Sequence, residues 1–257
     1  LLYNNLKFKN ICMKKICLIG GSGVLGKHFV KQLSIKNELH VADIGLKDSK
    51  KSNKLFTYYL DLNNEKSIEE FFFKNKKNPF DILINNSAFT TEMAVKTNTI
   101  KDIFSSEIFE KTIQINLKGI FLCCKNFIKY HHKKNIDQRV INISTMYALH
   151  GPHHAIYKEE NFFSSLSYSA SKAGVVGMTK WLATKYAIEN TNFNTVSPAG
   201  VFNNQNKRFL KKYSELIPKK KMATQEQIFS AIKFLISKNA DYVVGQDIFV
   251  DGGFSAW

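Results

Sequence analysis

The stretch Lys15-Ile-Cys-Leu-Ile-Gly-Gly-Ser-Gly-Val-Leu-Gly26 decides the fold. A short apolar run ends at Ile19, and glycines follow at Gly20, Gly23 and Gly26. Apolar residues at helical spacing come next, at Leu25, Phe29, Val30 and Leu33. Glycines let a backbone turn tightly and approach a phosphate, whose charge the N–H groups of a helix N-terminus receive. The stretch therefore predicts a strand, a phosphate-binding turn and a helix.

Outside this stretch, apolar runs and helical patterns alternate. Further strands are predicted at Leu39 to Ala42, Leu55 to Leu60, Asp81 to Ile84, Arg139 to Ile143, Phe193 to Ser197 and Asp247 to Val250. Long helices are predicted at Ile113 to Ile128, Tyr168 to Asn190 and Gln225 to Ser237. The alternation predicts an α/β fold, a single-domain Rossmann-type doubly wound parallel sheet flanked by helices on both faces. We expect residues 13–257 to form this domain and residues 1–12 to be an N-terminal extension or upstream read-through.

Asp43 strengthens the interpretation of the glycine turn. It lies 23 residues after Gly20, at the end of the second strand, where an acidic side chain accepts hydrogen bonds from an adenosine ribose. A carboxylate there repels a 2′-phosphate, so NAD is favoured over NADP. Nearby lysines could accommodate that phosphate and keep NADP open: Lys47, Lys50, Lys51 and Lys54.

Tyr168 and Lys172 lie four residues apart at the start of a predicted helix, so they share one face. The spacing alone is uninformative, because Tyr3 with Lys7 and Tyr130 with Lys134 match it too. Tyr168 differs by its context. It follows the strand that ends before Ser144 and Thr145, which places it at the ligand-binding edge of the sheet.

At this point the chain, from Met13 to Trp257, resembles the short-chain dehydrogenase/reductase family. The matching segments are the turn Gly20 to Gly26, Asp61-Leu62, Asn85-Asn86-Ser87-Ala88, Asn116 in Gln-Ile-Asn-Leu-Lys-Gly, Tyr168-Ser-Ala-Ser-Lys172, Ser197-Pro198-Ala199-Gly200-Val201 and Val250-Asp251-Gly252-Gly253. The resemblance implies catalytic roles for Asn116, Thr145, Tyr168 and Lys172. It implies cofactor binding by Gly20, Ser22, Gly23, Val24, Leu25, Gly26, Asp43, Asp61, Leu62, Asn86, Ser87, Ala88, Tyr168, Lys172, Pro198, Gly200 and Val201.

The chain departs from the family pattern in four places. Val24 stands where many members have glycine, and Ser87-Ala88 replaces Ala-Gly. Asn203 lies near a position where the family has a cofactor-contacting Thr. Thr145 aligns with the catalytic Ser, and its hydroxyl can donate the same hydrogen bond.

The resemblance implies transfer of a hydride between nicotinamide and a carbinol carbon, with Tyr168 as general acid/base. A phenol with a pKa of about 10 is a weak base near neutrality, so Lys172 and the positive nicotinamide should lower that pKa. Thr145 would hold the substrate oxygen. Asn116 would organise a water relay to Lys172.

The segment from Met146 to Ser167 is longer than the family's usual substrate loop and rich in polar residues, which suits a hydroxyl-rich ligand. Met146-Tyr147, Gly151-Pro152, Tyr157, Asn203-Asn204-Gln205 and the ending Gly252 to Trp257 resemble a subgroup associated with flagellin modification and nonulosonic-acid loci. This resemblance implies a sugar, amino-sugar or nucleotide-sugar substrate and a role in surface glycan synthesis. Two alternatives stay open: a 3-oxoacyl or other small-ketone reductase, and a catalytically silent nucleotide-binding regulator.

Composition narrows the remaining possibilities. With 44% hydrophobic residues the chain can bury a core, and no long uncharged apolar stretch predicts a membrane span. We expect a cytoplasmic protein whose cysteines are reduced and buried. We expect no metal site, since His150, His153 and His154 are not accompanied by a pattern of cysteine or carboxylate ligands. The net charge of +16 comes from lysines distributed along the chain, which does not establish a nucleic-acid-binding face.

Family resemblance also implies a homodimer or homotetramer. The expected interface uses the two long helices, Lys111 to Tyr130 and Tyr168 to Asn190.

Overall fold

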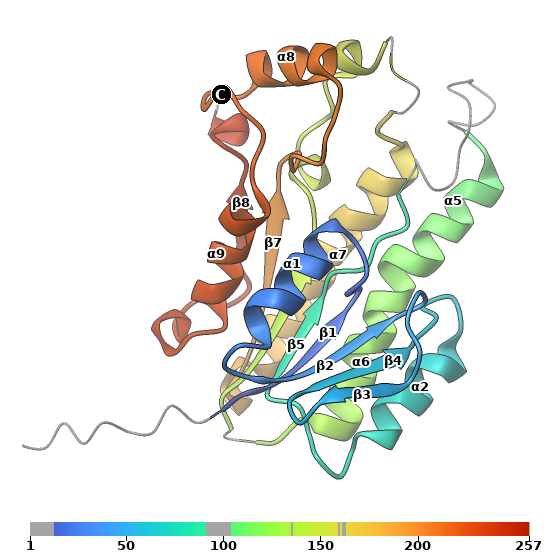
Figure 1. Cartoon of the computed structure of the whole chain (residues 1–257), viewed down its shortest axis with the longest axis vertical. Helices are drawn as coiled ribbons and strands as arrows, with labels where there is room; N and C mark the ends of the chain where they lie inside the picture. The colour runs from blue at the N-terminus through green and yellow to red at the C-terminus, as the bar shows by residue number, and fades with distance from the viewer. Residues whose placement is uncertain (1–12, 91–103, 135, 159, 161–162, 257) are drawn as a thin grey trace, which may run out of the picture.

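The computed structural model describes residues 13–90, 104–134, 136–158, 160 and 163–256. These residues form one eight-stranded sheet in the order β3-β4-β2-β1-β5-β6-β7-β8 (Figure 1). The expected α/β fold is confirmed. The expected extension, residues 1–12, lies outside the described residues.

The strands are β1 Lys15–Ile19, β2 Glu38–Asp43, β3 Ser49–Ser52, β4 Leu55–Tyr59, β5 Ile82–Asn85, β6 Gln138–Ile143, β7 Thr191–Pro198 and β8 Asp247–Val250. The α-helices are α1 Val24–Leu33, α2 Glu65–Lys74, α5 Ser106–Ile113, α6 Ile120–His131, α7 Leu166–Tyr186, α8 Lys207–Leu216 and α9 Gln225–Leu235. A π-helical turn, Gln114–Gly119, joins α5 to α6.

Seven of the described strands run parallel, and β3 pairs antiparallel with β4 at the edge of the sheet. The register aligns Ile19 at the end of β1 with Ala42 of β2 and with Asn85 of β5. The carboxyl ends of the central strands therefore reach the same edge together. Sequence analysis missed β3, because Ser-Lys-Lys-Ser has no hydrophobic pattern to signal a strand.

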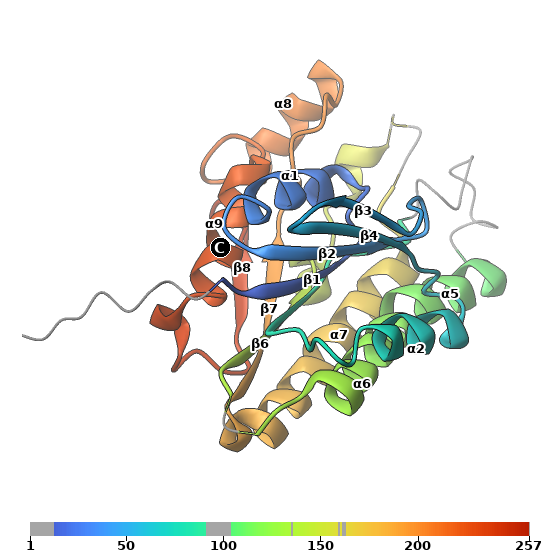
Figure 2. The ribbon, with the colours of Figure 1, turned by 60° about the horizontal axis from the view of Figure 1, so that its bottom comes forward.

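Helices cover both faces of the sheet, as the central strand already requires. In β1 the side chains of Cys17 and Ile19 join one core, whereas those of Ile16 and Leu18 join the other. Alternate residues of a strand point to opposite faces, so a strand that is apolar throughout is buried on both. Helices α2, α6 and α7 pack on the first core, and α1 and α9 pack on the second (Figure 2).

A third, smaller core lies beyond the carboxyl ends of β6 and β7. It joins Met146, Ile156 and Tyr157, which follow β6, to Phe209 and Tyr213 of α8. Two short 3-10 turns, Met146–Ala148 and His154–Tyr157, carry the first group. We call this assembly of the two turns, α8 and the segment up to Met222 the roof. Figure 1 shows α8 at the end of the molecule to which β7 leads.

The helices differ from expectation at several points. The predicted continuous helix from Ile113 to Ile128 is interrupted by the π-helical turn, and α7 gives way to a 3-10 turn after Tyr186. Helix α8 was not predicted. No helix of the described residues is both long and apolar enough to span a bilayer.

The cysteines that the structure describes are free thiols in the interior. Cys17, Cys123 and Cys124 are all at most 1% exposed. Burial raises the pKa of Cys124 to about 12, so the thiol stays protonated. Their expected burial is confirmed, and Cys12 lies outside the described residues.

His131 makes stability depend on pH. Its ring is 1% exposed, accepts the Phe80 N–H at Nδ1 (3.1 Å) and hydrogen-bonds the Phe72 carbonyl through Nε2 (3.0 Å). Burial lowers its pKa to about 4, whereas an unfolded histidine titrates near 6.5. The neutral ring is therefore favoured in the fold, and stability is present above about pH 6.5 and falls as the pH drops towards 4.

We expect acidification from pH 7 to 4 to cost about 2 to 3 kcal/mol of unfolding free energy through His131 alone. Urea unfolding at several pH values measures it. His131→Phe should be less stable at pH 7 but lose less on acidification, whereas His153→Gln, at an exposed position, should follow the parent. An unchanged pH slope in His131→Phe would contradict this assignment.

Candidate active site

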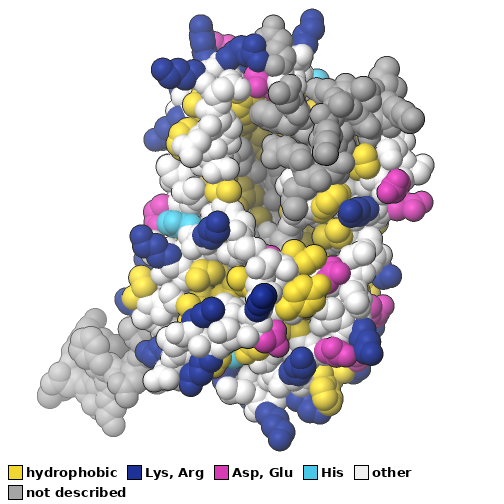
Figure 3. All heavy atoms as spheres, turned by 45° about the vertical axis from the view of Figure 1, so that its right-hand side comes forward, with side chains coloured by type: hydrophobic (Ala, Val, Ile, Leu, Met, Phe, Trp, Pro, Cys, Tyr) yellow, Lys and Arg dark blue, Asp and Glu magenta, His cyan; other side chains and the backbone are white. Residues whose placement is uncertain are grey.

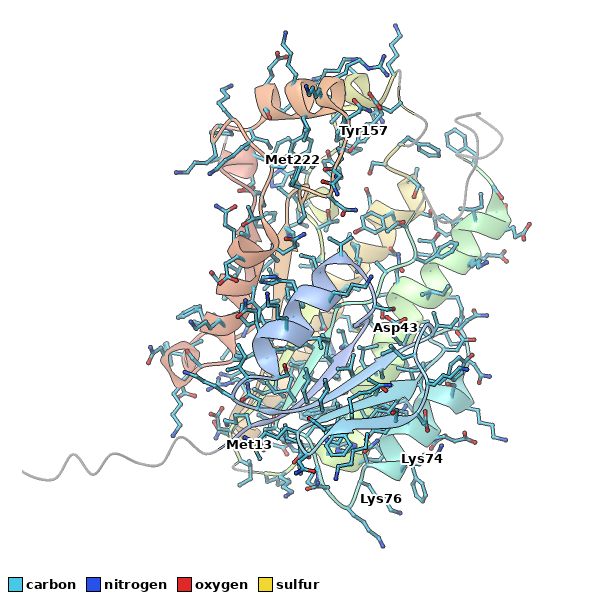
Figure 4. The ribbon with its side chains drawn as sticks, in the orientation of Figure 1. Met13, Asp43, Lys74, Lys76, Tyr157 and Met222 are labelled. Atoms are coloured by element: carbon cyan, nitrogen blue, oxygen red, sulfur yellow. The ribbon has the colours of Figure 1, made fainter. Side chains whose placement is uncertain are left out.

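The predicted site residues follow the carboxyl ends of five strands. Gly20 follows β1, Asp43 ends β2, Asn86 follows β5, Thr145 follows β6 and Gly200 follows β7. Because these strands are parallel and adjacent, the residues gather along one edge of the sheet, where ligands of such folds bind. Asp43, labelled in Figure 4, lies near the N-terminal end of α1.

The glycine turn is held by backbone contacts that leave no room for side chains. Gly20 has φ +88°, and a Cβ there would lie 2.5 Å from the Ser87 nitrogen. At Gly26 a Cβ would lie 2.2 Å from the Gly20 carbonyl oxygen. Gly23 differs: it caps α1 with φ −74°, and a Cβ there would meet nothing within 4 Å. Gly23 thus borders open space at a helix N-terminus, as a phosphate-binding turn requires.

Val24 and Leu25 begin α1, with Val24 42% exposed and Leu25 packed against the core. Asp43 binds the turn directly. Its carboxylate accepts the Ser22 N–H at 3.1 Å and the Gly45 N–H at 2.9 Å. These bonds fix the carboxylate beside the turn, and the four lysines that follow, from Lys47 to Lys54, are exposed on the loop and the β3–β4 hairpin.

Two more predicted segments lie against the same edge. Asn86 donates from Nδ2 to the Gly20 carbonyl at 2.7 Å, which joins the end of β5 to the glycine turn. Asp61 accepts the Asn63 N–H at 2.8 Å, while the buried Leu62 lies under Gly119. Ser87 and Ala88 are half-buried in the segment between Asn86 and Phe89.

Asn116 lies in the π-helical turn and is fully buried. Its Oδ1 accepts the Phe89 N–H at 2.6 Å, and its Nδ2 donates to the Phe89 carbonyl at 2.9 Å and to Ser171 Oγ at 3.3 Å. One amide thus connects the segment after β5 to α7. Single π-helical turns inside helices are frequent at functional sites, and this one aims Asn116 inward.

Lys172 is 1% exposed in α7, and its Nζ donates to the Ile143 carbonyl at 2.8 Å. Burial lowers its pKa to about 8. Ser144 donates from Oγ to the Lys172 carbonyl at 3.2 Å, so the end of β6 is bonded to α7 twice. Tyr168 lies one helical turn earlier, where its N–H donates to Ser165 Oγ at the helix start.

Thr145 and Tyr168 line one cavity of about 450 Å³. Thr145 follows β6, and its hydroxyl accepts the Tyr147 N–H at 3.4 Å. Other lining residues are Thr90, Met146, Tyr147, Tyr157, Phe163, Ser164, Ala199, Gly200, Val201, Asn203, Gln205, Phe209, Tyr213 and Met222. The described residues of this lining include no charged side chain, but many hydroxyl and amide groups. Pro198 is buried at the end of β7.

Sequence analysis missed the part of this cavity that α8 and the segment up to Met222 provide. Tyr213 accepts the Gly200 N–H, and a Cβ on Gly200 would lie 2.7 Å from the Tyr213 ring. Asn206 caps α8 by accepting the Phe209 N–H at 2.8 Å. A capping Asn followed by apolar residues at helical spacing could have predicted α8.

A buried carboxylate connects the two halves of the roof. Glu160 is 8% exposed, accepts from Asn206 Nδ2 at 2.8 Å and pairs with Arg208 Nε at 3.3 Å. Tyr147 and Tyr157 add a hydroxyl contact of 3.1 Å within the cavity. Of the long segment from Met146 to Ser167, the described residues Met146, Tyr147, Tyr157, Phe163 and Ser164 line the cavity. His150, in the same segment, packs against Phe249 and Phe254.

Alanine substitutions at Gly23 and Gly26 should have different effects: the first should weaken dinucleotide binding, and the second should lower stability. A methyl group at Gly26 meets backbone, so Gly26→Ala should cost roughly 1 to 3 kcal/mol of stability. Gly23→Ala should keep the parent melting temperature but weaken dinucleotide binding about tenfold, because its methyl enters the open space before α1. Thermal melts and titration with NADH measure the two effects. Parent-like NADH affinity in Gly23→Ala would show that the phosphates do not bind there.

Comparisons with known proteins agree with this geometry. The profile described as Enoyl-(Acyl carrier protein) reductase matches residues 36–255. The chain is 32% identical to 3-oxoacyl-[acyl-carrier-protein] reductase of Buchnera aphidicola subsp. Schizaphis graminum, over 93% of this chain and 97% of that one. It is 27% identical to the Post-translational flagellin modification protein A of Campylobacter coli, over 94% and 98% of the two chains.

A solved short chain dehydrogenase from Leptospira borgpetersenii, with bound NAD+, matches at a TM-score of 0.83 and 29% identity, over 95% of this chain and 93% of that one. A structure from Agrobacterium tumefaciens with bound NADP matches at 0.79 and 25%, over 96% and 98%. The family profile and the Buchnera relative each cover most of the chain, and the segments from the glycine turn to Lys172 occupy one site. This protein therefore belongs to the short-chain dehydrogenase/reductase family of NAD(P)-dependent oxidoreductases.

Proposed function

We propose that the protein transfers a hydride between NAD(P) and an alcohol or ketone group of a sugar-like substrate, in surface glycan or flagellin-modification synthesis. The observation that carries the proposal is the cavity that Thr145 and Tyr168 share, with polar, uncharged side chains around it. When bound, the nicotinamide ring supplies or accepts the hydride. The residues of this chain bind the two reactants and move the proton.

The cofactor would lie along the strand ends, with its pyrophosphate at Gly23 and its adenosine ribose at Asp43. The open space at Gly23 and the fixed Asp43 carboxylate support this assignment. The carboxylate favours NAD, since it repels a 2′-phosphate. Asn86, bonded to Gly20, would hold the turn in its binding conformation.

Tyr168 would donate or accept the hydroxyl proton of the substrate. The Lys172 amine, one helical turn away, would favour the phenolate by its positive charge. Because burial brings the pKa of Lys172 to only about 8, most of the amine is protonated at neutral pH. Thr145 would donate a hydrogen bond to the substrate oxygen. Asn116 would hold the Phe89 backbone and α7 in place, and its water relay to Lys172 stays a prediction.

The lining favours a hydroxylated ring as substrate. Tyr147, Tyr157 and Asn203 bring polar side chains to the cavity, whereas the Gln205 amide is bonded to the backbone of Asn203 and Val201. Buried polar groups that a hydroxyl-free ligand leaves unpaired cost binding energy, so such a lining selects for a polar ligand. The flagellin modification relative, similar over nearly the full length of both chains, supports the proposed role in flagellin modification.

A second candidate is a 3-oxoacyl reductase. The Buchnera relative carries that name, and a second cavity of about 650 Å³ adjoins the first through Tyr157, Phe163 and Ser164. Its other lining residues include Phe104, Leu166, Ala170 and Ala173, which would suit an acyl chain.

We expect reduction or oxidation of a sugar, amino sugar or nucleotide sugar, followed at 340 nm with NAD, NADP and their reduced forms. NAD should be used better than NADP. Tyr168→Phe should bind the cofactor as the parent does but lower turnover by a factor of at least 100, since it removes the general acid. Turnover of 3-oxoacyl thioesters alone would favour the second candidate. Cofactor binding with no turnover on either panel would favour the catalytically silent regulator.

We also propose a cytoplasmic homodimer or homotetramer. The buried, free thiols fit a reducing compartment. Helices α6 and α7 lie side by side on one face of the sheet, and they expose Phe121 by 48% and Trp181 by 65% (Figure 2). Large apolar side chains so exposed on neighbouring helices are typical of a protein interface.

Trp181→Glu should convert the oligomer to a smaller species, because it places a charge in the interface. Light scattering at micromolar concentration measures the mass. Ile35→Glu, which changes an equally exposed residue after α1, should leave the mass unchanged. A monomeric parent protein would refute the proposal.

A further inference from the structure

The segment from Lys207 to Lys221 is one of several strongly basic stretches of the chain. The 15 residues from Lys207 to Lys221 contain seven Lys or Arg and one Glu, a net charge of +6. The whole chain has +16, so the other 242 residues share +10. The charge per residue is therefore about ten times higher in this segment than its average over the rest of the chain. The lysines of this segment form a basic surface.

This segment is α8 and the turn after it, which together form the outer side of the roof. The buried side chains of α8, Phe209 and Tyr213, line the cavity, whereas Lys207 and Lys211 lie exposed on the opposite side of the helix. Lys219, Lys220 and Lys221 continue the exposed surface. Figure 3 shows dark blue side chains gathered at this end of the molecule, and Figure 4 shows α8 beyond Tyr157 and Met222.

The basic surface and the cavity are separated by one helix. A helix with its side chains is about 10 to 12 Å across, which is close to the Debye length of about 8 to 10 Å at physiological salt. Charges at that distance still attract an anion near the cavity. Arg208 pairs with the Glu160 carboxylate, which offsets part of the charge, and Lys220 donates to the Glu215 carbonyl.

The cavity and the surface would therefore recognise different parts of one molecule. The described lining has no charged side chain, so the group that reacts beside Tyr168 is expected to be uncharged. An anionic group on the same substrate would remain outside, within the field of α8. Clefts bordered by charge of one sign raise the local concentration of oppositely charged ligands and speed their association.

We propose that the substrate is a phosphorylated sugar, which is either a sugar phosphate or a nucleotide-linked sugar. The surface from Lys207 to Lys221 attracts and holds its phosphate. The inference rests on the proposed function for the ring that reacts. It goes further on two points: the substrate is negatively charged, and the segment from Lys207 to Lys221 recognises that charge. The electrostatic contribution predicts an affinity that falls as salt rises.

Calorimetry tests the proposal on the full chain saturated with NAD. The probes are N-acetylglucosamine, its 1-phosphate and UDP-N-acetylglucosamine, at 50 and 300 mM salt. We expect the two phosphorylated probes to bind at least tenfold more tightly than the neutral sugar at 50 mM salt, with most of that preference lost at 300 mM.

The key variant is Lys207→Glu with Lys211→Glu, which reverses two exposed charges that do not line the cavity. It should remove most of the preference for phosphorylated probes. The matched control, Lys74→Glu with Lys77→Glu, makes the same change in net charge at and just beyond the end of α2, far from α8 (Figure 4 labels Lys74), and should keep the preference. If the reversed variant does not fold, Lys207→Gln with Lys211→Gln should give about half the effect.

Turnover separates this inference from the proposed function. For any phosphorylated sugar that reacts, the reversed variant should raise KM and leave kcat within twofold, because the charges act on binding. Phosphate-dependent binding with no turnover would leave the surface assignment standing while the proposed function fails. Equal binding of neutral and phosphorylated probes would overturn the inference, as would an unchanged preference for the phosphorylated probes in the reversed variant.

Discussion

Close backbone packing at the glycine turn is the constraint on which the rest of the structure depends. Three strands meet there through single hydrogen bonds. The Gly20 N–H donates to the Ala42 carbonyl at 2.8 Å, Asn86 donates to the Gly20 carbonyl, and the Ser22 N–H donates to Asp43. Because Gly26 brings α1 against the same turn, the ends of β1, β2 and β5 and the start of α1 are placed by one another. No side chain fits between them.

The second half of the site is placed by β6 and α7. Lys172 and Ser144 exchange bonds with backbone carbonyls across these elements, and Asn116 links α7 to the segment after β5. Burying an amine is unfavourable unless it is hydrogen-bonded, and the Ile143 carbonyl supplies that bond. The position of the amine thus follows from the packing of the helix on the sheet.

Much of this arrangement could be predicted from the sequence, because it depends on short-range patterns. The apolar runs of β1, β5 and β6, the glycine spacing and the four-residue spacing of Tyr168 and Lys172 are all local signals. The π-helical turn has no such signal, since its apolar residues fit a continuous helix and tertiary contacts of Asn116 decide the break. Strand β3 is polar and forms only because β4 offers an unpaired edge. Helix α8 was overlooked because its many lysines obscure the spacing of Phe209 and Tyr213.

The roof has a hydrophobic core of its own, separate from the two cores that flank the sheet. None of its described members lies in the glycine turn, so substitutions in it alter the shape of the cavity without changing the contacts of that turn. Selection can therefore change Phe209, Tyr157 or Met222 in small steps while the reacting groups stay in register. A lineage that inherits this fold can acquire a new substrate specificity through substitutions in the roof alone. The sequence of the sheet then still shows its ancestry.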